Sequence, residues 1–463
     1  MHIADLLIIS GYFILIVFSA LFRRKKSGSA SEFIMAGRNL TLFPFVATLV
    51  STAYGWVLGI GQLYYTYGVS AWFFLSLPYT LTALLLGFFF SEKARKTDAI
   101  TLSDILSKTY DRRVGNLGNI LMLVYTAPFM YVLMAAQIIW FVSAWPMWLC
   151  ILLSIFFSVV YVYAGGFRSV VQANFFQFLL MFFGFAVAAL FLYLKFGGQV
   201  LKTLPDQLTH AKLSYSVPYI VGWFLLALIT LVDPAYYQRI FATSNARTAK
   251  WGVIISVAWW TLFDFLAIVV ALYSRALIPD LQQAQFSYPE LIGSFLPPLV
   301  GGIFAVSLLS TVMSTSNSYL FLTSLIISKD LLHGNNWFKG LSVQNLTRWV
   351  ISGVCLLCFV ICMWYRNESA VDIFFDFIPV VTSAMLLPVL SFYFKRLSMP
   401  SSWVLFQMGC SIFIVAGYQL AGKIFPEVMG DNSWIFDEFN PAYPGLFTAL
   451  MVQIFYLLFC KHK

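Results

Sequence analysis

The sequence predicts an all-α membrane protein with about 13 transmembrane helices, and three observations support this prediction. Of its 463 residues, 60% are hydrophobic and only 10% are charged, which is too little charge to cover a soluble protein of this size. Apolar runs of about 20 residues recur along the chain, which is the length that crosses a bilayer as a helix. The runs are continuous, without the period-two alternation of strands, so helices are favoured. The third observation is that Lys and Arg are concentrated in alternate loops between these runs.

The positive-inside rule fits this topology well. With the N-terminus outside, 22 of the 28 Lys and Arg residues fall in inner loops and six in outer loops. We therefore expect a plasma (inner) membrane protein with a cytoplasmic C-terminus. Contact of the inner loops with anionic lipid explains the net charge of +9, so no nucleic-acid partner is expected. The predicted spans are residues 5–22, 41–63, 70–91, 115–143, 146–164, 169–194, 216–243, 249–274, 297–328, 345–364, 370–394, 402–421 and 442–460.

Other residue types point away from enzymatic or metal chemistry. The four His residues lie outside the predicted spans, and the six Cys residues form no disulfide framework. The first span lacks a basic stretch before it and is followed by RRKK, so we expect it to be retained as a helix. The sequence closes with KHK just after the last span, so no output domain is expected.

Two predicted spans carry signals of a broken helix. The second contains STAYGWVLGIG, with Gly55, Gly59 and Gly61 close together, and the seventh contains LVDPAYYQR, in which Asp233 precedes Pro234. Pro removes a backbone donor and disfavours helix at the residue before it, and broken helices free carbonyls for cations. Spans two and seven lie five apart, as expected if spans 2–6 and 7–11 are inverted repeats. Ordinary kinks remain an alternative, since Gly and Pro are common in membrane helices.

A stripe of hydroxyls lies along the ninth span, in the stretch LLSTVMSTSNSYLF. On a helix, Ser307, Thr311, Ser314, Thr315 and Ser318 share one face. These side chains can bond back to their own helix and let neighbouring helices pack closely. Alternatively, their neutral oxygens supply ligands for a hard cation such as Na⁺ without placing a full charge in the bilayer.

Three carboxylates, Asp233, Asp264 and Asp376, fall inside predicted spans, where such groups are costly and usually functional. Structural pairing with a backbone or basic group is the alternative. The sequence shows no basic residue in the middle of a span as a partner. Trp56, beside the break in span two, is the first candidate for contact with a solute. Further candidates are Tyr54, Gln62, Gln137, Asp233 and Tyr236.

From Ser31 to Arg396, the chain resembles the sodium:solute symporter family, which includes sodium/proline and sodium/glucose transporters. Five stretches in order carry this resemblance, each weak alone. They are EFIMAGRNL, TLSDILSKTYDRR, YVYAGGFRSVVQANFFQ, DPAYYQRIFATSNARTAKWG and TVMSTSNSYLFLTSLIISKDL.

The resemblance implies the leucine-transporter-like fold, with a five-plus-five inverted-repeat core. The first repeat would cover residues 41–196 and the second 216–396, with residues 1–40 and 397–463 peripheral. It also implies a sodium site between spans two and nine. On span nine, the ligands would be the carbonyl of Thr311 and the hydroxyls of Ser314 and Thr315. On span two, they would be the carbonyls of Leu49 and Thr52, or of Val50 and Ala53 if the register shifts by one residue.

Departures from the family pattern narrow the expected function. Asn174 and Asn317 stand where some members hold a second sodium, so we expect one Na⁺ per cycle. At positions where sugar transporters hold hydroxyls, this chain has Trp56, Leu226 and Ile229, which argues against a sugar. Pro234 matches proline-transporter-like members.

We therefore expect Na⁺-coupled symport of a small organic solute by alternating access, carried out by a monomer. The solute is expected to be amino-acid-like, a carboxylate or an amine, and the sequence does not separate a cationic amine from a zwitterion. Two alternatives remain. One is H⁺ coupling through an intramembrane Asp, and the other is a membrane sensor that does not transport.

Overall fold

The computed structural model describes residues 2–22, 30–210, 215–333, 336–338, 340–366, 368–424 and 439–461. Ten helices in these ranges are long and apolar enough to span a membrane, and an eleventh span is a pair bent by 63°. Two shorter apolar helices, Ile3–Phe18 and Met147–Val160, complete the set. These elements correspond one to one with the thirteen predicted apolar segments, and no strand occurs in the described ranges. The all-α prediction is confirmed.

The α-helices are α1 (Ile3–Phe22), α2 (Ala30–Met35), α3 (Leu42–Ala53), α4 (Val57–Tyr67), α5 (Leu77–Leu85), α6 (Ser91–Arg95), α7 (Leu102–Thr109), α8 (Arg112–Tyr125), α9 (Phe129–Ser143), α10 (Met147–Phe196), α11 (Asp206–Thr209), α12 (Val217–Ala227), α13 (Pro234–Ala242), α14 (Ala246–Leu277), α15 (Ser287–Ser294), α16 (Val300–Leu325), α17 (Val343–Trp364), α18 (Ala370–Tyr393), α19 (Ser401–Ile424) and α21 (Ala442–Phe455). Short 3₁₀ or π turns extend several of them, including Trp72–Ser76 before α5, Leu228–Leu231 after α12 and Ile326–Leu332 after α16.

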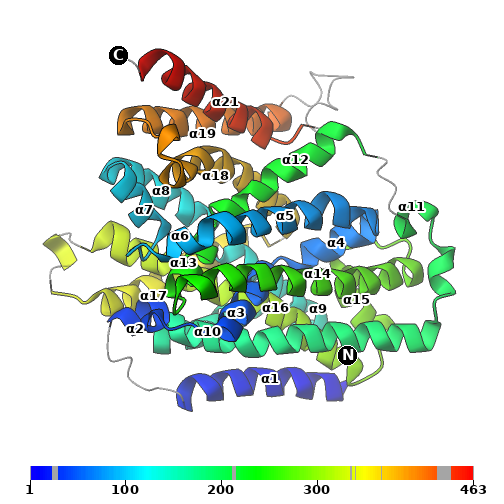
Figure 1. The fold of residues 1–463 in the computed structure, drawn as a ribbon. Helices are drawn as coiled ribbons and strands as arrows, with labels where there is room; N and C mark the ends of the chain where they lie inside the picture. Colours follow the sequence, from blue (N-terminus) through cyan, green and yellow to red (C-terminus); the bar gives the residue numbers. More distant parts are fainter. Residues whose placement is uncertain are drawn as a thin grey trace.

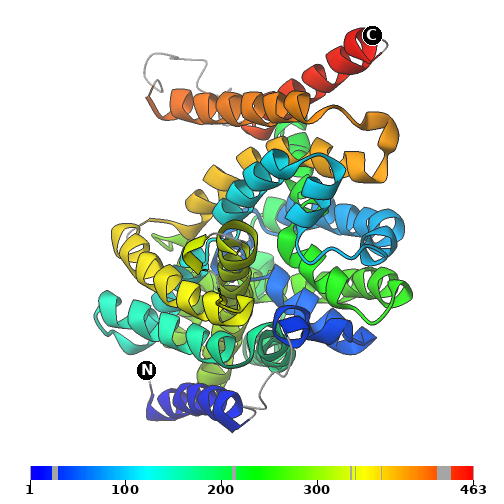
Figure 2. The same ribbon diagram turned by 90° about the vertical axis from the view of Figure 1, so that its left-hand side faces the viewer.

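The hydroxyl-rich helix α16 forms the centre of the bundle. Of its most apolar stretch, 89% is buried inside the protein, against 28% for α19 and 22% for the span that contains α21. Figures 1 and 2 show α1 along one edge of the molecule and α19 with α21 along the opposite edge. The polar face of α16 is therefore enclosed by other helices and does not face lipid.

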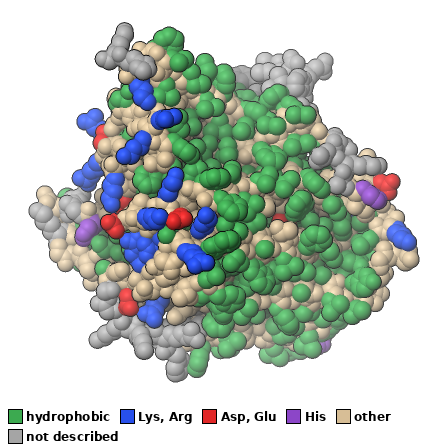
Figure 3. Space-filling model, viewed as in Figure 1, with side chains coloured by type: hydrophobic (Ala, Val, Ile, Leu, Met, Phe, Trp, Pro, Cys, Tyr) green, Lys and Arg blue, Asp and Glu red, His purple; other side chains and the backbone are tan. Residues whose placement is uncertain are grey.

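The surface has the zoning of a multi-pass membrane protein. Figure 3 shows hydrophobic side chains covering a broad middle belt, while Lys and Arg gather at the left-hand end of the molecule. Many large hydrophobic side chains of the described residues are exposed, such as Leu194, Phe265 and Phe413. An exposed apolar band of this extent is stable only against lipid.

Both predicted breaks in the helices are confirmed. The second span is interrupted at Tyr54–Trp56, between α3 and α4. The seventh is interrupted between the turn that ends at Leu231 and the start of α13 at Pro234. There the Asp233 carboxylate accepts hydrogen bonds from the backbone N–H of Ala235 at 2.7 Å and of Tyr236 at 3.3 Å, so it caps α13.

Helix α10 runs from Met147 to Phe196 but is divided at Gly166, which takes a left-handed backbone conformation with φ of 59°. A Cβ atom at this position would lie 2.5 Å from the carbonyl oxygen of Phe33. The position therefore requires glycine twice over, for the sign of φ and for the close approach of α2. This division separates two predicted spans that are otherwise continuous.

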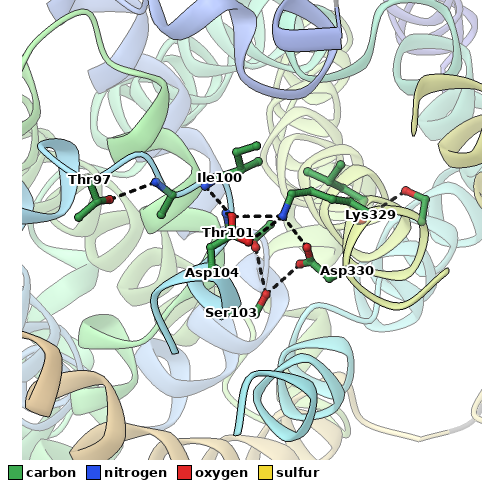
Figure 4. Close-up of polar contacts among 10 residues, drawn as sticks. Thr97, Ile100, Thr101, Ser103, Asp104, Lys329 and Asp330 are labelled. Atoms are coloured by element: carbon green, nitrogen blue, oxygen red, sulfur yellow. Dashed lines mark hydrogen bonds and ion pairs between the residues drawn. The ribbon is translucent and has the colours of Figure 1, made fainter. Parts of the chain in front are cut away.

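An ion-pair network ties the short helix α7 to the end of the central helix (Figure 4). The Lys329 ammonium lies 2.9 Å from Asp104 and 2.5 Å from Asp330, and Ser103 donates to Asp330 at 2.9 Å. Burial acts to raise the pKa of Asp104, but Lys329 and two backbone N–H groups outweigh it, so this pKa is lowered. Asp104 is thereby held as a carboxylate that fixes α7 against the bundle.

The sequence predicts that Asp376 lies inside a span, and the structure corrects this prediction. Asp376 lies at the edge of its span with 44% of its side chain exposed, and it pairs with Lys423 at 2.9 Å. Its partner comes from α19, far along the chain, so no local sequence pattern indicates the pairing. Asp376 is a surface ion pair and takes no part in the buried polar core.

The structure predicts that Gly166→Ala lowers the thermal stability of the detergent-solubilised protein. A non-glycine residue in a left-handed conformation costs roughly 1–2 kcal/mol, and the clash with Phe33 adds to it. Gly353→Ala in α17 is the matched control, since its Cβ meets no atom within 4 Å. The measurement is the melting temperature by thermal-shift assay. Equal melting temperatures for the two variants would contradict the assignment.

Candidate functional site

The end of α3 contacts the middle of α16 through two hydroxyl–carbonyl hydrogen bonds. The Ser314 hydroxyl donates to the Ser51 carbonyl at 2.7 Å, and the Thr315 hydroxyl donates to the Thr52 carbonyl at 2.7 Å. This approach depends on Gly55, because a Cβ atom there would lie 2.2 Å from the Thr315 hydroxyl oxygen. The break in the second span is therefore closed by the polar face of α16.

Five neutral oxygens gather at this contact. The Ser314 hydroxyl also lies 2.7 Å from the Thr311 carbonyl, which joins the two span-two carbonyls and the two hydroxyls. Carbonyl and hydroxyl oxygens without a carboxylate suit a hard monovalent cation, since they supply ligands without a full charge. Turning the two hydroxyl protons away would free all five oxygens for such an ion. The residues present fit Na⁺.

The predicted span-nine residues and Thr52 are brought together here, whereas Leu49 is not. The second carbonyl at the contact belongs to Ser51, and neither Val50 nor Ala53 provides one. The reason lies in the helix end. The N–H groups four residues beyond Ser51 and Thr52 fall in the break, so these carbonyls lose their helical partners. Leu49 lies a turn earlier, where the N–H four residues on is still helical.

A buried arginine lies directly beside this contact. Arg239 is fully buried, and in the sequence it lies near the end of the predicted span 216–243. Its Nη2 donates to the hydroxyls of Thr52 and Ser318, both at 2.7 Å. Its Nε donates to the Thr48 carbonyl at 3.2 Å, and Nη1 to the Ala235 carbonyl at 3.0 Å. The guanidinium thus joins α13 to both α3 and α16, with each bond charge-assisted.

The two asparagines that the sequence singled out occupy different settings. The side-chain amide of Asn174 lies 3.0 Å from the hydroxyls of Thr48 and Thr52 and 3.1 Å from that of Ser318. It therefore shares its neighbours with Arg239. Asn317 is fully buried, and its amide has no hydrogen-bond partner within the described part of the chain. The Arg239 guanidinium and the Asn174 amide thus contact the same two hydroxyls, those of Thr52 and Ser318.

A cavity adjoins this contact at Thr52. Both helix breaks open into it, because Trp56 and Asp233 lie on its wall. The lining residues are Thr52, Ala53, Tyr54, Trp56, Ile60, Leu75, Ser76, Tyr79, Thr80, Tyr125, Tyr131, Ile229, Thr230, Asp233, Tyr236, Trp260, Asp264 and Tyr319.

Four of the six predicted solute-contact residues line this cavity, namely Tyr54, Trp56, Asp233 and Tyr236. Gln62 and Gln137 do not. Gln62 lies in the middle of α4 but is not part of the cavity wall, and Gln137 is buried within α9. Sequence reasoning missed most of the tyrosines on the wall, because the chain contains 24 of them and their helical spacing does not mark which face the cavity.

Two carboxylates lie on the cavity wall, each held by a tyrosine. Tyr125 donates to Asp233 at 2.9 Å, and Tyr54 donates to Asp264 at 3.0 Å. Both side chains are nearly fully buried, with 5% and 3% of their surface exposed. Asp264, which the sequence marked only as an intramembrane acid, is therefore part of the cavity together with Asp233.

Comparison with known proteins relates the chain to transporters. Residues 33–401 match the model of the sodium:solute symporter family. The sodium/pantothenate symporter of Escherichia coli (strain K12) is 24% identical over 93% of this chain and 90% of its own length. The human high affinity choline transporter 1 is 23% identical over 71% of this chain and 62% of its own length.

Solved structures show the same fold. A Na⁺-coupled sialic acid symporter superposes with a TM-score of 0.79 at 14% identity, covering 98% of this chain and 97% of its own. Mhp1, a nucleobase-cation-symport-1 family transporter, reaches 0.57 at 12% identity, covering 91% and 92%. The leucine-transporter-like fold predicted from the resemblance is confirmed.

The structure predicts that Arg239→Lys destabilises the protein strongly, on the order of 3–5 kcal/mol, because lysine cannot reproduce the planar fork of donors in a buried site. Arg247→Lys is the matched control, since Arg247 is exposed at the start of α14. Melting temperatures and recovery from size-exclusion chromatography measure the effect. A variant at position 239 as stable as the control would show that the fork is dispensable.

Proposed function

The chain belongs to the sodium:solute symporter family, whose members transport solutes and are not enzymes, and we propose that it couples one Na⁺ to the uptake of a small organic solute. The observation that carries the proposal is the five-oxygen contact between α3 and α16. Sodium would bind there, and the solute would bind in the adjoining cavity.

A shared residue links the two sites. Thr52 contributes its carbonyl to the ion contact, and it also lines the cavity. Sodium would join the hydroxyls of α16 to the carbonyls of α3 and thereby fix the broken segment that forms the cavity wall. A solute would then meet a preformed wall, which is how ion and solute binding become cooperative.

A stoichiometry of one sodium is supported by Arg239. The guanidinium contacts the hydroxyls of Thr52 and Ser318, and Asn174 contacts the same pair. A fixed positive charge at hydrogen-bond distance from these oxygens opposes the entry of a second cation. The site therefore has oxygens for one mobile ion, beside a permanent one supplied by the protein.

Proton coupling is the second candidate, because Asp264 is buried and faces the cavity. Uptake into proteoliposomes separates the two couplings. A Na⁺ gradient without a pH gradient should drive accumulation under the first, and a pH gradient in Na⁺-free buffer under the second. Accumulation under the pH gradient alone would overturn sodium coupling.

The sodium site is tested by Ser314→Ala combined with Thr315→Val, which removes two hydroxyl ligands while nearly preserving volume. Each lost ligand should weaken Na⁺ binding about tenfold or more, or roughly 1.4 kcal/mol each. The readout is the Na⁺ concentration for half-maximal thermal stabilisation, relative to K⁺, which needs no knowledge of the solute. Ser316→Ala is the matched control on the same helix, since its hydroxyl forms a hydrogen bond with that of Ser158 on α10. Unchanged Na⁺ dependence in the double variant would sink the assignment.

A further inference from the structure

We infer that the solute of this cavity is a small organic cation, an alkylated ammonium such as a quaternary amine. The inference rests on the proposed function, since it names the class of solute that the proposed carrier takes. Charge, helix capping and the arrangement of aromatic rings in the cavity carry it.

The charged residues on the wall of the cavity are both acidic. Asp233 and Asp264 belong to its 18 described lining residues, and none of these residues is Lys, Arg or His. Arg239 is not among them, although it is near enough for its charge to act on Asp233, and its donors are taken by hydroxyls and carbonyls of α3, α13 and α16. Two carboxylates in a space of low dielectric favour a cationic guest and repel an anionic one.

The helix end that would hold a solute carboxylate is already occupied. In broken membrane helices, the free N–H groups at the start of a half-helix are the usual receptor for an anionic group. Here the Asp233 carboxylate takes the N–H groups of Ala235 and Tyr236, at the start of α13. A zwitterion would need the other half-helix, α4, which begins at Val57.

Aromatic rings surround the same space. Tyr236 and Trp260 stack with ring centroids 5.8 Å apart and an interplanar angle of 17°. Tyr319 contacts Tyr131 edge to face at 5.1 Å and Tyr125 at 5.9 Å. All five rings lie on the cavity wall. Aromatic surfaces around a desolvated space attract cations through the ring quadrupole, and they also accept methyl groups.

The hydrogen bonds of the carboxylates favour an alkylated nitrogen over a primary amine. Asp233 accepts from one tyrosine and two backbone N–H groups. Asp264 accepts from Tyr54 and has Ser76 and Tyr64 as further hydrogen-bond partners. A primary ammonium brings three N–H donors that each need an acceptor in a buried site. An alkylated ammonium has few or none, and it gains from charge and ring contact alone.

Matched ligands test the inference directly. The panel is choline, its uncharged carbon isostere 3,3-dimethyl-1-butanol, glycine betaine and proline, each added to purified protein in Na⁺ buffer. We expect choline to raise the melting temperature at concentrations at least about tenfold lower than the other three. Stabilisation by the isostere, betaine or proline at equal or lower concentration would overturn the inference, as would no stabilisation by choline.

Charge-removing variants locate the binding. Asp264→Asn and Asp233→Asn, the second of which keeps an acceptor for the cap of α13, should each weaken choline stabilisation by tenfold or more. The Na⁺-specific stabilisation should persist in both. Asp376→Asn, which alters a surface carboxylate, is the control and should bind choline like the unaltered protein. Choline binding unchanged in both cavity variants would contradict the assignment.

Failure of the inference is distinguishable from failure of the proposed function. Na⁺-driven accumulation of betaine or proline without that of choline would leave symport standing and overturn the cation assignment. Choline binding without Na⁺-driven accumulation would support the cation assignment and overturn the proposed symport.

Discussion

The core of this protein depends on one constraint, which is that backbone carbonyls freed inside a membrane must find partners without water. The break after α3 frees the carbonyls of Ser51 and Thr52, and the hydroxyls of Ser314 and Thr315 donate hydrogen bonds to them. The proposed function uses the same four neutral groups. A monovalent cation would bind between the hydroxyl and carbonyl oxygens once the hydroxyl protons rotate away, and the hydrogen bonds would hold the segment when the ion is absent.

A permanent charge stabilises the surroundings of this contact. Buried guanidinium groups are costly unless every donor is used, and Arg239 donates to α3, α13 and α16 at once. It thus joins the helix segments beside both breaks, although these segments lie far apart in the sequence. Because its bonds to Thr52 and Ser318 flank the ion contact, any movement of α3 against α16 also alters the environment of this charge.

Much of the architecture could be predicted from the sequence, because the length of apolar runs matches the bilayer thickness and basic loops indicate its inner side. Both breaks were found from Gly and Pro, and the hydroxyl stripe pointed to Thr311, Ser314 and Thr315, which lie at the contact between α3 and α16. The carbonyl of Ser51 at this contact was not predicted, because the exact end of α3 decides which carbonyls are free, and the nearby glycines do not mark it. Arg239 was missed for a different reason. An arginine near the polar end of a span can lie in a loop or in a buried network. The neighbouring sequence looks the same in both cases.

The cavity wall contains one carboxylate that the sequence pattern marks for this site and one that only tertiary packing brings there. Asp233 was recognised from its place before Pro234, because helix capping is a local property that neighbouring residues reveal. Asp264 lies in the middle of the continuous helix α14, and only packing against Tyr54 brings it to the same wall. The charge of the cavity is therefore a tertiary property, built from carboxylates on two helices. Since Asp233 also fills the positive end of α13, one residue both adds negative charge to the cavity and removes the place for an anion. Selectivity for charge in this fold can thus be set by the capping of a broken helix, without any change in the helices that form it.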